Sequence, residues 1–502
     1  MEDAGLGSWP SRRARKTPDR IAIAAGGREW TYRQLDDRVR RLAAGLRGLG
    51  VARGDRIAYL GPNHPAFLET LFAAGALGAV FVPLNTRLAD EELAYVLEDS
   101  GSTVLIHSPE HTAFADKQDQ VHHRVGPERY DELLAEPLSG SILETVGLDD
   151  PCMLMYTSGT TGRPKGAVLT HGNITWNALN VIVDIDLAGD EVTLVVAPLF
   201  HTAGLNMTCL PTLLKGGRVV LLDKFDPGTA LEAIESHGVT YMFGVPTMFD
   251  AMANHSHWDT TDLSSVRQLA CGGAPVPEST IRVYLGRGLG FSQGYGMTEC
   301  SPGVLFLDRE RAHSKAGTAG VPHFFTDVRL LRPDGEDAGP GEAGEVVVRG
   351  PNVTTGYWGL PEASAAAFQD GWFRSGDLAK TDDDGFVSIV DRIKDVIISG
   401  GENIYPAEVE SSLLDHPGVA DTAVIGVPDE QWGEVGRAVV VPRTAEAPTE
   451  RELLDWLDGK LARYKIPKSV VFATELPRNA TGKLLKAALR ARYGPQHGDL
   501  GS

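Results

Sequence analysis

Residues 156–166 read Tyr156-Thr157-Ser158-Gly159-Thr160-Thr161-Gly162-Arg163-Pro164-Lys165-Gly166, a polar stretch between two apolar runs. Residues 151–155 precede it and residues 167–169 follow it, and both runs suit buried strands. Glycines let backbone N–H groups approach an anion, hydroxyl side chains donate hydrogen bonds, and Arg163 and Lys165 supply positive charge. We interpret the stretch as a phosphate-binding loop between two strands. A Gly/Ser/Thr-rich surface hairpin is the competing interpretation.

The spacing within this loop excludes the Walker A phosphate-binding motif. That motif requires Gly-x4-Gly-Lys-Ser/Thr and leads into a helix. Here Gly162 lies three residues before Lys165, Pro164 intervenes, and Gly166 follows the lysine. Because an apolar run comes next, we expect a strand after the loop rather than a helix.

Composition and charge indicate a globular protein of more than one domain. A chain of 502 residues exceeds what one ordinary core accommodates. With 42% hydrophobic and 23% charged residues, the chain has the composition of a folded, soluble protein rather than a disordered one. Its formal net charge of −20 argues against nucleic acid or an anionic membrane surface as the main partner. An anionic substrate therefore needs a local basic site, such as this loop offers.

The cysteines and the distribution of apolar residues favour a cytoplasmic protein. Cys152, Cys209, Cys271 and Cys300 lack Cys-x-x-Cys spacing, so they indicate neither a zinc ribbon nor a disulfide framework. No apolar segment follows the basic residues 12–16 in the manner of a secretory signal. The sequence contains no uninterrupted run of about 18 apolar residues, so we expect no integral membrane segment. The sequence leaves the oligomeric state open, a homodimer included.

The first 300 residues alternate strand-like and helix-like segments, which predicts a layered α/β domain. Thr31 and Gln34 form a capping box before residues 35–49, where apolar side chains recur at helical spacing. Later apolar runs each end in a turn rich in Gly or Pro: residues 192–197, 219–222, 240–245, 268–270 and 290–292. Parallel α/β sheets bind ligands at the carboxyl ends of their strands, so we expect these loops to converge on one crevice.

The remaining segments differ in composition and in the secondary structure that we expect. Residues 108–148 are polar, and we expect irregular, solvated structure there rather than a metal site at its histidines. From residue 317, valine-rich runs separated by turns predict a β-rich section, in which Asp382–Gly385 is a turn rather than a calcium loop. We expect the end of the chain to form a small α+β domain, with helices at 408–414 and 451–463 and strands at 420–427, 438–441 and 470–472.

Eight stretches occur in an order that resembles the adenylate-forming superfamily, which contains acyl-CoA synthetases, luciferases and peptide-synthetase adenylation domains. They are Tyr156–Gly166, Ala197–His201, Gly272–Pro275, Gln293–Glu299, Ser375–Asp377, Asp391–Asp395, Gly400–Glu408 and Pro477–Lys483. The resemblance implies activation of a carboxylate by ATP as acyl-AMP, release of pyrophosphate, and transfer of the acyl group to CoA. It also implies a large N-terminal multi-subdomain α/β domain, residues 1–392, and a small mobile α+β C-terminal domain, residues 393–502.

This chemistry brings an attacking carboxylate next to a triphosphate, so cations and aligned donors must offset the charge. The resemblance assigns Glu299 to Mg²⁺, which prefers oxygen ligands, and Thr298 to the α-phosphate. It assigns Tyr295 to the adenine ring. The ATP- or AMP-binding residues that it implies are Thr157, Ser158, Gly159, Thr160, Thr161, Gly162, Lys165, Gly273, Ala274, Gln293, Gly294, Tyr295, Gly296, Met297 and, at the ribose, Asp377 and Arg392.

The same resemblance implies that the C-terminal domain changes position between two half-reactions. Lys483 would reach the carboxylate and the α-phosphate during adenylation. Lys394 would be the hinge, because a residue at the end of an element can absorb a large change of backbone angles. After the change of position, Ser399, Gly400 and Gly401 would bind CoA. The implied catalytic residues are Lys483, Thr298, Glu299 and His201.

The run Phe200-His201-Thr202-Ala203-Gly204 is similar to that of fatty- and aryl-acid CoA ligases, including those for medium and long chains. The implied acyl pocket consists of His201, Ala203, Gly204, Leu205, Phe243, Gly244 and Val245. Since these residues are mostly apolar, we expect an aliphatic, alicyclic or aromatic monocarboxylic acid of lipid or secondary metabolism, without a defined chain length or ring system.

Three alternatives stay open beside an acyl-CoA synthetase. One is a free-standing ligase that loads a carrier-protein thiol or stops at acyl-AMP, and another is luciferase-like oxidation of an acyl adenylate. A non-catalytic nucleotide-binding relative is disfavoured, because Lys483 and Glu299 are both present.

Overall fold

The computed structural model describes residues 4–135, 144–157, 163–273, 276, 278–399, 402–429, 431–444, 447–458, 460–478 and 484–494. The chain divides into two compact units. The first consists of Met1–Val328 and Val348–Arg374, and the second of Arg329–Val347 and Ser375–Ser502. The first unit is built from α/β layers and the second mixes helices with mostly antiparallel strands, which confirms the predicted fold class.

A six-stranded sheet of the first unit carries the two strands that flank residues 158–162. Its order is β6-β5-β3-β4-β7-β8, parallel throughout except for the antiparallel pair β7–β8. The strands are β3 (Arg56–Leu60), β4 (Val80–Pro83), β5 (Ser102–His107), β6 (His123–Val125), β7 (Pro151–Thr157) and β8 (Lys165–Thr170). The predicted strand after the loop is therefore confirmed.

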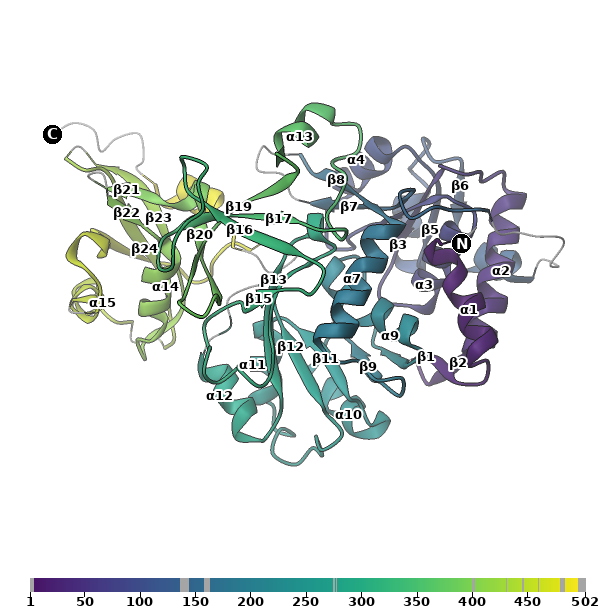
Figure 1. Cartoon of the computed structure of the whole chain (residues 1–502), viewed down its shortest axis with the longest axis horizontal. Helices are drawn as coiled ribbons and strands as arrows, with labels where there is room; N and C mark the ends of the chain where they lie inside the picture. Colours follow the sequence, from purple (N-terminus) through teal and green to yellow (C-terminus); the bar gives the residue numbers. More distant parts are fainter. Residues whose placement is uncertain are drawn as a thin grey trace. The chain divides into compact units, whose positions relative to one another are not determined.

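Helices at the start of the chain pack together beside this sheet (Figure 1). They are α1 (Trp9–Lys16), α2 (Tyr32–Gly48) and α3 (Pro65–Ala76). The predicted capping box is present, since Thr31 accepts from the Gln34 backbone N–H and Gln34 accepts from that of Thr31. Helix α2 buries Leu35, Leu42 and Leu46 completely or nearly so, as their helical spacing predicts.

A nine-stranded sheet forms the other part of the first unit, in the order β15-β14-β13-β12-β11-β9-β10-β1-β2. The central strands from β13 to β1 are parallel. The strands are β1 (Ile21–Ala25), β2 (Arg28–Thr31), β9 (Val192–Val195), β10 (Arg218–Leu221), β11 (Tyr241–Gly244), β12 (Gln268–Cys271), β13 (Phe291–Gly296), β14 (Gly303–Leu307) and β15 (Val321–Pro322).

Three helices cover one face of this sheet: α10 (Pro227–His237), α11 (Pro246–Ala253) and α12 (Glu278–Gly286) (Figure 1). A buried cluster joins them to the strands and includes Phe249, Tyr284 and Phe291. Burial of such aromatic side chains contributes roughly 3 kcal/mol each by area, which fixes the strand edge where the loops emerge.

The segment 108–148 is more regular than predicted. It contains 3₁₀-helix η2 (Pro109–His111), α5 (Thr112–Ala115), β6 and α6 (Pro127–Ala135). Tyr130, Leu133 and Leu134 are buried, because their spacing places them on one side of α6. The overall polarity of the segment hid this short amphipathic helix.

A five-stranded sheet in the order β16-β17-β19-β18, with β20 on β19, forms the predicted β-rich section. Its strands are β16 (Asp327–Leu331), β17 (Gly344–Arg349), β18 (Phe368–Gln369), β19 (Trp372–Thr381) and β20 (Val387–Arg392). Asp382–Gly385 is a turn, as predicted, in which Asp382 accepts backbone hydrogen bonds from Asp384 and Phe386.

The end of the second unit is a small α+β body around the sheet β22-β21-β24-β23, with β25 on β24. Its elements are β21 (Ile397–Ser399), β22 (Glu402–Ile404), α14 (Pro406–Leu414), β23 (Val419–Asp429), β24 (Gly433–Pro442), α15 (Glu450–Leu457), β25 (Ser469–Phe472) and α16 (Lys486–Tyr493). The predicted helix 451–463 is too long: α15 ends at Leu457, before the Asp458-Gly459 pair, because these residues favour helices poorly.

Among the described residues, no helix combines the length and the apolarity needed to span a membrane. The four cysteines are buried free thiols.

Candidate active site

Several predicted site residues follow the carboxyl ends of neighbouring parallel strands in the first unit. His201 follows β9, Val245 follows β11, Gly273 follows β12, and Thr298 and Glu299 follow β13. Because β9, β11, β12 and β13 are parallel neighbours, these residues emerge at one edge of the sheet. This edge is where open α/β sheets bind ligands.

The phosphate-loop residues Ser158–Gly162 and Ala274 lie outside the described residues. The strands on either side of the loop pair up to Thr157 and Lys165, which face each other in the last register of β7 and β8. On the first flank, the Tyr156 hydroxyl donates to Asp99 Oδ2 at 2.6 Å. On the second, the Arg163 guanidinium lies over the Tyr95 ring, 5.3 Å from its centroid. Both ends of the loop are thus anchored to helix α4 (Asp90–Ser100).

Tyr357 connects two predicted site residues and was not identified from the sequence. Lys165 Nζ lies 5.2 Å from the centroid of the Tyr357 ring, a cation–π distance. The hydroxyl of Tyr357 donates to Glu299 Oε1 at 2.9 Å. Burial and the nearby Glu299 carboxylate raise the pKa of Tyr357, so the phenol keeps its proton. No quoted motif includes Tyr357, and only the preceding Gly356 signals a turn at this place.

Main-chain hydrogen bonds fix the segment around Tyr357. The Trp358 N–H donates to the Gly166 carbonyl at 2.8 Å, and the Thr354 N–H donates to the Glu299 carbonyl at 2.6 Å. The Asn352 side-chain amide donates to the carbonyls of Cys300 and Gly303, each at 2.8 Å. Residues 352–358 therefore hold β8 and the residues after β13 in one arrangement.

Strand β13 supplies the predicted nucleotide residues Gln293, Gly294, Tyr295 and Gly296, and Met297 follows directly. The Gln293 side chain is buried and donates to the Thr318 carbonyl at 2.5 Å. Tyr295 is half-buried, opposite Leu305 in β14. A Cβ at Gly296 would lie 2.0 Å from the Pro302 carbonyl oxygen, so only glycine fits this position.

The donors at Thr298 and Glu299 fit magnesium rather than a metal held by protein alone. Among the described residues, no group of three His, Cys, Asp or Glu side chains could hold a metal ion. Mg²⁺ commonly binds one or two carboxylates together with substrate phosphates. A single carboxylate that Tyr357 links to Lys165 is consistent with that mode.

The predicted acyl pocket includes His201, and its residue Leu205 begins a π-helical turn, Leu205–Cys209. His201 Nε2 is buried and has no hydrogen-bond partner among the residues that the structure describes, and burial lowers the pKa of His201 to about 4. Its imidazole is therefore neutral near pH 7. A Cβ at Gly204 would lie 2.4 Å from the Pro198 carbonyl oxygen, so glycine is required where the chain turns into the π-helix.

The other predicted acyl-pocket residues lie on two neighbouring elements. Phe243 and Gly244 end β11, and Val245 precedes α11. Phe243 and Ala203 belong to one apolar cluster with Met207 of the π-helical turn. Leu205 is fully buried.

Asn206 is a second residue that the sequence did not reveal. It is 1% exposed, and neither its Oδ1 nor its Nδ2 has a hydrogen-bond partner in the part of the chain that the structure describes. A buried amide without partners costs about 1–3 kcal/mol, so such groups in folded proteins require an explanation. The π-helical turn provides context, since such turns are frequent at functional sites. In the sequence, Asn206 is a lone amide within an apolar run, which is the signal that could have identified it.

Two predicted ribose residues are paired in the second unit. Arg392 Nε lies 3.1 Å from Asp377 Oδ1, and the two residues face each other across β19 and β20. Lys394 is exposed in the short 3₁₀-helix Ile393–Asp395, and Ser399 ends β21. Gly400, Gly401 and Lys483 lie outside the described residues.

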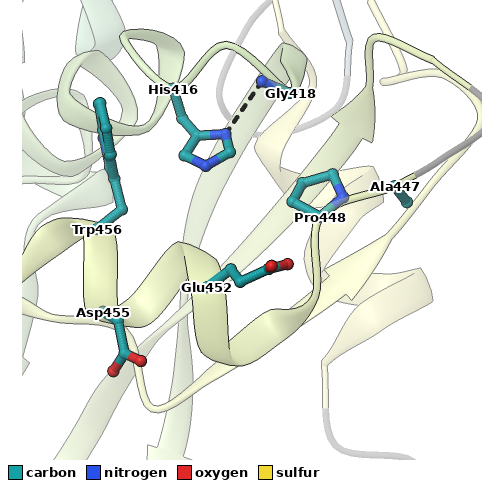
Figure 2. Close-up of a pocket in the computed structure, with 7 residues that line it drawn as sticks. All are labelled: His416, Gly418, Ala447, Pro448, Glu452, Asp455 and Trp456. Carbon is teal, nitrogen blue, oxygen red and sulfur yellow. Dashed lines mark hydrogen bonds between the residues drawn. The ribbon is translucent and has the colours of Figure 1, made fainter.

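A surface pocket in the second unit contains none of the predicted site residues (Figure 2). The rings of His416 and Trp456 are 5.0 Å apart in an edge-to-face arrangement, and His416 Nδ1 accepts from the Gly418 N–H. Glu452 Oε2 accepts from the backbone N–H and the hydroxyl of Thr449, which caps the N-terminus of α15. Because these groups serve local structure, the pocket is not a candidate active site.

Comparisons with known proteins agree with the motifs. Residues 10–358 match the family model described as AMP-binding enzyme, and residues 408–483 match the AMP-binding enzyme C-terminal domain. A feruloyl-CoA synthase of an Amycolatopsis species is 59% identical over 496 residues, which cover 98% of this chain and 100% of the relative. The indoleacetate–CoA ligase of Aromatoleum aromaticum is 42% identical, with 97% of each chain covered.

A solved structure shows the same fold with nucleotide bound. The o-succinylbenzoate CoA synthetase of Bacillus subtilis, in complex with ATP and a magnesium ion, superimposes with a TM-score of 0.89 at 36% identity. The match covers 96% of this chain and 99% of that structure. Because the family model spans more than half of the sequence, the chain belongs to the AMP-binding enzyme family, within the adenylate-forming superfamily that its motifs predict.

Proposed function

We propose that this protein is an AMP-forming acyl-CoA synthetase whose acid is aromatic and carries a ring hydroxyl, with ferulate as the first candidate. The reaction class, an ATP-dependent acid–thiol ligase, follows from the family and from the named CoA synthetases and ligases related to it. The observation that carries the proposed acid is the 59% identity to feruloyl-CoA synthase over 98% of the chain.

The reaction has two steps. In the first, a carboxylate oxygen of the acid attacks the α-phosphorus of ATP, and the bond to pyrophosphate breaks, giving acyl-AMP. In the second, the CoA thiol loses its proton and attacks the acyl carbon, and AMP leaves with the bonding electrons. ATP, Mg²⁺ and CoA are therefore the required small molecules, as in the related CoA ligases.

The first unit has groups suited to the first step. In our proposal, Lys165 and the loop Thr157–Gly162 bind the departing phosphates, and Glu299 holds Mg²⁺ against them. Thr298 contacts the α-phosphate, and Tyr295 packs on the adenine beside Gly273 and Ala274. The positions of Thr298, Glu299 and Gly273 at one sheet edge support these assignments. Offsetting charge with fixed donors is the main contribution a protein can make to this step.

In the same proposal, the C-terminal domain, residues 393–502, alternates about Lys394 against residues 1–392. Lys483 serves adenylation, and Ser399, Gly400 and Gly401 then receive CoA. The Asp377–Arg392 pair binds the ribose hydroxyls, since a carboxylate can accept hydrogen bonds from both. The exposed position of Lys394 directly after β20 supports its role as a hinge.

Two polar groups in an otherwise apolar region support a hydroxylated aromatic acid. The amide of Asn206 is buried and unpartnered, and a phenol hydroxyl can both donate to its Oδ1 and accept from its Nδ2. The neutral His201 carries no charge that would repel or attract an ion there. An aliphatic acid would leave the Asn206 amide unsatisfied, which disfavours fatty acids.

Pyrophosphate release and thioester formation across a panel of acids test this proposal. We expect ferulate and 4-hydroxycinnamate to react with higher kcat/KM than cinnamate or hexadecanoate in the presence of ATP, Mg²⁺ and CoA. Preference for hexadecanoate or cinnamate would overturn the proposed acid. Acyl-AMP formation without a CoA thioester would favour the carrier-protein ligase instead, and light emission with oxygen would favour luciferase-like oxidation.

A further inference from the structure

We propose that Tyr357 is a positioning residue that sets the Mg²⁺ requirement of adenylation, by holding the Glu299 carboxylate next to Lys165. This inference rests on the proposed roles of Glu299 as the magnesium ligand and Lys165 as a phosphate ligand. Tyr357 itself contacts neither the substrate nor the metal in this proposal.

The tyrosine bridges the two groups with different parts of one side chain. Its ring face lies 5.2 Å from Lys165 Nζ, and its hydroxyl donates to Glu299 Oε1 at 2.9 Å. Lys165 and Glu299 are 134 positions apart in the sequence; Lys165 begins β8, and Glu299 follows β13 of another sheet. Main-chain hydrogen bonds of Thr354 and Trp358 hold the two backbone segments together, and the Tyr357 side chain links the two side chains.

The hydrogen bond to Oε1 also restrains the orientation of the Glu299 carboxylate, which would hold Mg²⁺. A hydrogen bond to a ligating carboxylate orients it, and loss of such a partner weakens metal binding.

The role of the side chain can be separated from that of the backbone. The main-chain bonds from Thr354 to Glu299 and from Trp358 to Gly166 do not involve the Tyr357 side chain. The Tyr357 N–H donates to Ser364 Oγ at 2.9 Å, which any residue at this position can do. Tyr357→Phe should therefore fold normally while losing only the bond to Glu299.

The experiment measures adenylation of ferulate by the full-length enzyme as a function of Mg²⁺ and of ATP. Tyr357→Phe keeps the ring over Lys165, and we expect it to raise the half-saturating Mg²⁺ concentration about 3–10-fold with little change in the KM for ATP. Tyr357→Leu also removes the ring, and we expect a further rise of about 3-fold in the KM for ATP. Conversion of supplied acyl-AMP and CoA to thioester should stay unchanged in both variants.

Tyr464→Phe is the matched control, because Lys465 also lies near the ring of Tyr464 while the side chain is exposed in the second unit. It should leave the Mg²⁺ dependence unchanged. If Glu299→Gln shifts the Mg²⁺ requirement and Tyr357→Phe does not, the inference is wrong and the proposed function stands. If neither variant shifts it, the assignment of Glu299 fails, and the inference fails with it.

Discussion

Two groups of proposed site residues in the first unit, the phosphate-end residues and the acyl-pocket residues, differ in whether their polar side chains have partners in the protein. Among the proposed phosphate-end residues, Tyr357 contacts both Lys165 and Glu299. In the proposed acyl pocket, His201 Nε2 and the amide of Asn206 are buried and have no hydrogen-bond partner among the described residues. In our proposal, the acid makes the hydrogen bonds that these atoms of His201 and Asn206 lack.

This difference corresponds to the two tasks of the site: binding ATP, which all family members share, and recognising the acid, which varies between them. ATP is the same for every adenylating enzyme, so its ligands can be held by fixed contacts before it binds. The acid differs between enzymes, and its polar substituents must satisfy groups that the empty protein leaves unpaired. In our proposal, the unpaired buried atoms of His201 and Asn206 therefore mark where the acid is selected.

The largest expected effect is that of Lys483→Ala. If Lys483 acts on ATP and the carboxylate and not on the rest of the acid, adenylation of every acid should fall about 10²–10³-fold in this variant. The factor should be the same for ferulate and cinnamate. Thioester formation from supplied acyl-AMP and CoA should persist. Single-turnover assays of each half-reaction measure both effects, and equal loss of both half-reactions would refute the domain alternation.

Glu299→Gln should have the next largest effect. Removing the charge of the proposed ligand should raise the half-saturating Mg²⁺ concentration about 10–100-fold, again without altering the order of acids. Mg²⁺ titrations with several acids test this expectation. A change of acid preference in this variant would contradict the idea that the ATP-binding residues do not affect the choice of acid.

Asn206→Leu should act on selection alone. Leucine removes the unpaired amide, so the ratio of kcat/KM for ferulate over cinnamate should fall about 10-fold or more. Adenylation of cinnamate itself should continue at a comparable rate. An unchanged ratio would show that another group recognises the ring hydroxyl.

Asn177→Leu is the matched control for stability. The Asn177 amide donates to the Asn206 carbonyl at 2.9 Å, and its Oδ1 accepts from the Gly303 N–H at 3.0 Å. Its loss leaves two buried groups unpaired and should cost about 1–3 kcal/mol in the free energy of unfolding. Asn206→Leu should cost less than about 1 kcal/mol or stabilise the protein. Urea denaturation compares the two variants.

The smallest expected effect is a pH dependence of stability from His201. Burial lowers the pKa of His201 to about 4, below its value of about 6.5 in the unfolded chain. The unfolded state then binds more protons, so stability is fully present above pH 6.5 and falls as the pH decreases towards 4. His201→Gln should reduce this slope by up to about 1.4 kcal/mol per pH unit.

Urea midpoints between pH 7 and pH 4.5 measure the slope, with the exposed His122→Gln as control. His171 is a second contributor that remains in the variant, because burial also lowers its pKa to about 4. If the dependence of the free energy of unfolding on pH is the same in His201→Gln as in the original protein, His201 is not buried in its neutral form.

Local patterns in the sequence predicted the frame of the molecule. The apolar runs on both sides of the phosphate loop are β7 and β8, and Thr31 and Gln34 form the expected capping box. Each of these features depends on residues close together in the chain, so propensity and spacing suffice. The short helix α6 and the early end of α15 were missed, because overall polarity and a long leucine pattern outweighed weaker local signals.

The parts of the site that the sequence did not reveal depend on distant residues. Tyr357 contacts Lys165 and Glu299, which precede it by 192 and 58 positions. Asn206 is distinctive only because its amide is buried without a partner, which is a property of packing rather than of spacing. Motifs could therefore name candidate ligands for ATP, and they could not name the groups that we propose to arrange those ligands or to select the acid.

The π-helical turn Leu205–Cys209 has a consequence for how this enzyme can evolve. A π-turn holds more residues than an α-turn, so deletion of a single residue within it can restore an ordinary α-helix. Such a deletion would rotate the side chains on one side of the turn by about 100° relative to those on the other. We expect one in-frame codon loss to replace Asn206 in its buried position by a neighbour, and so to open a new substrate range in a single genetic step.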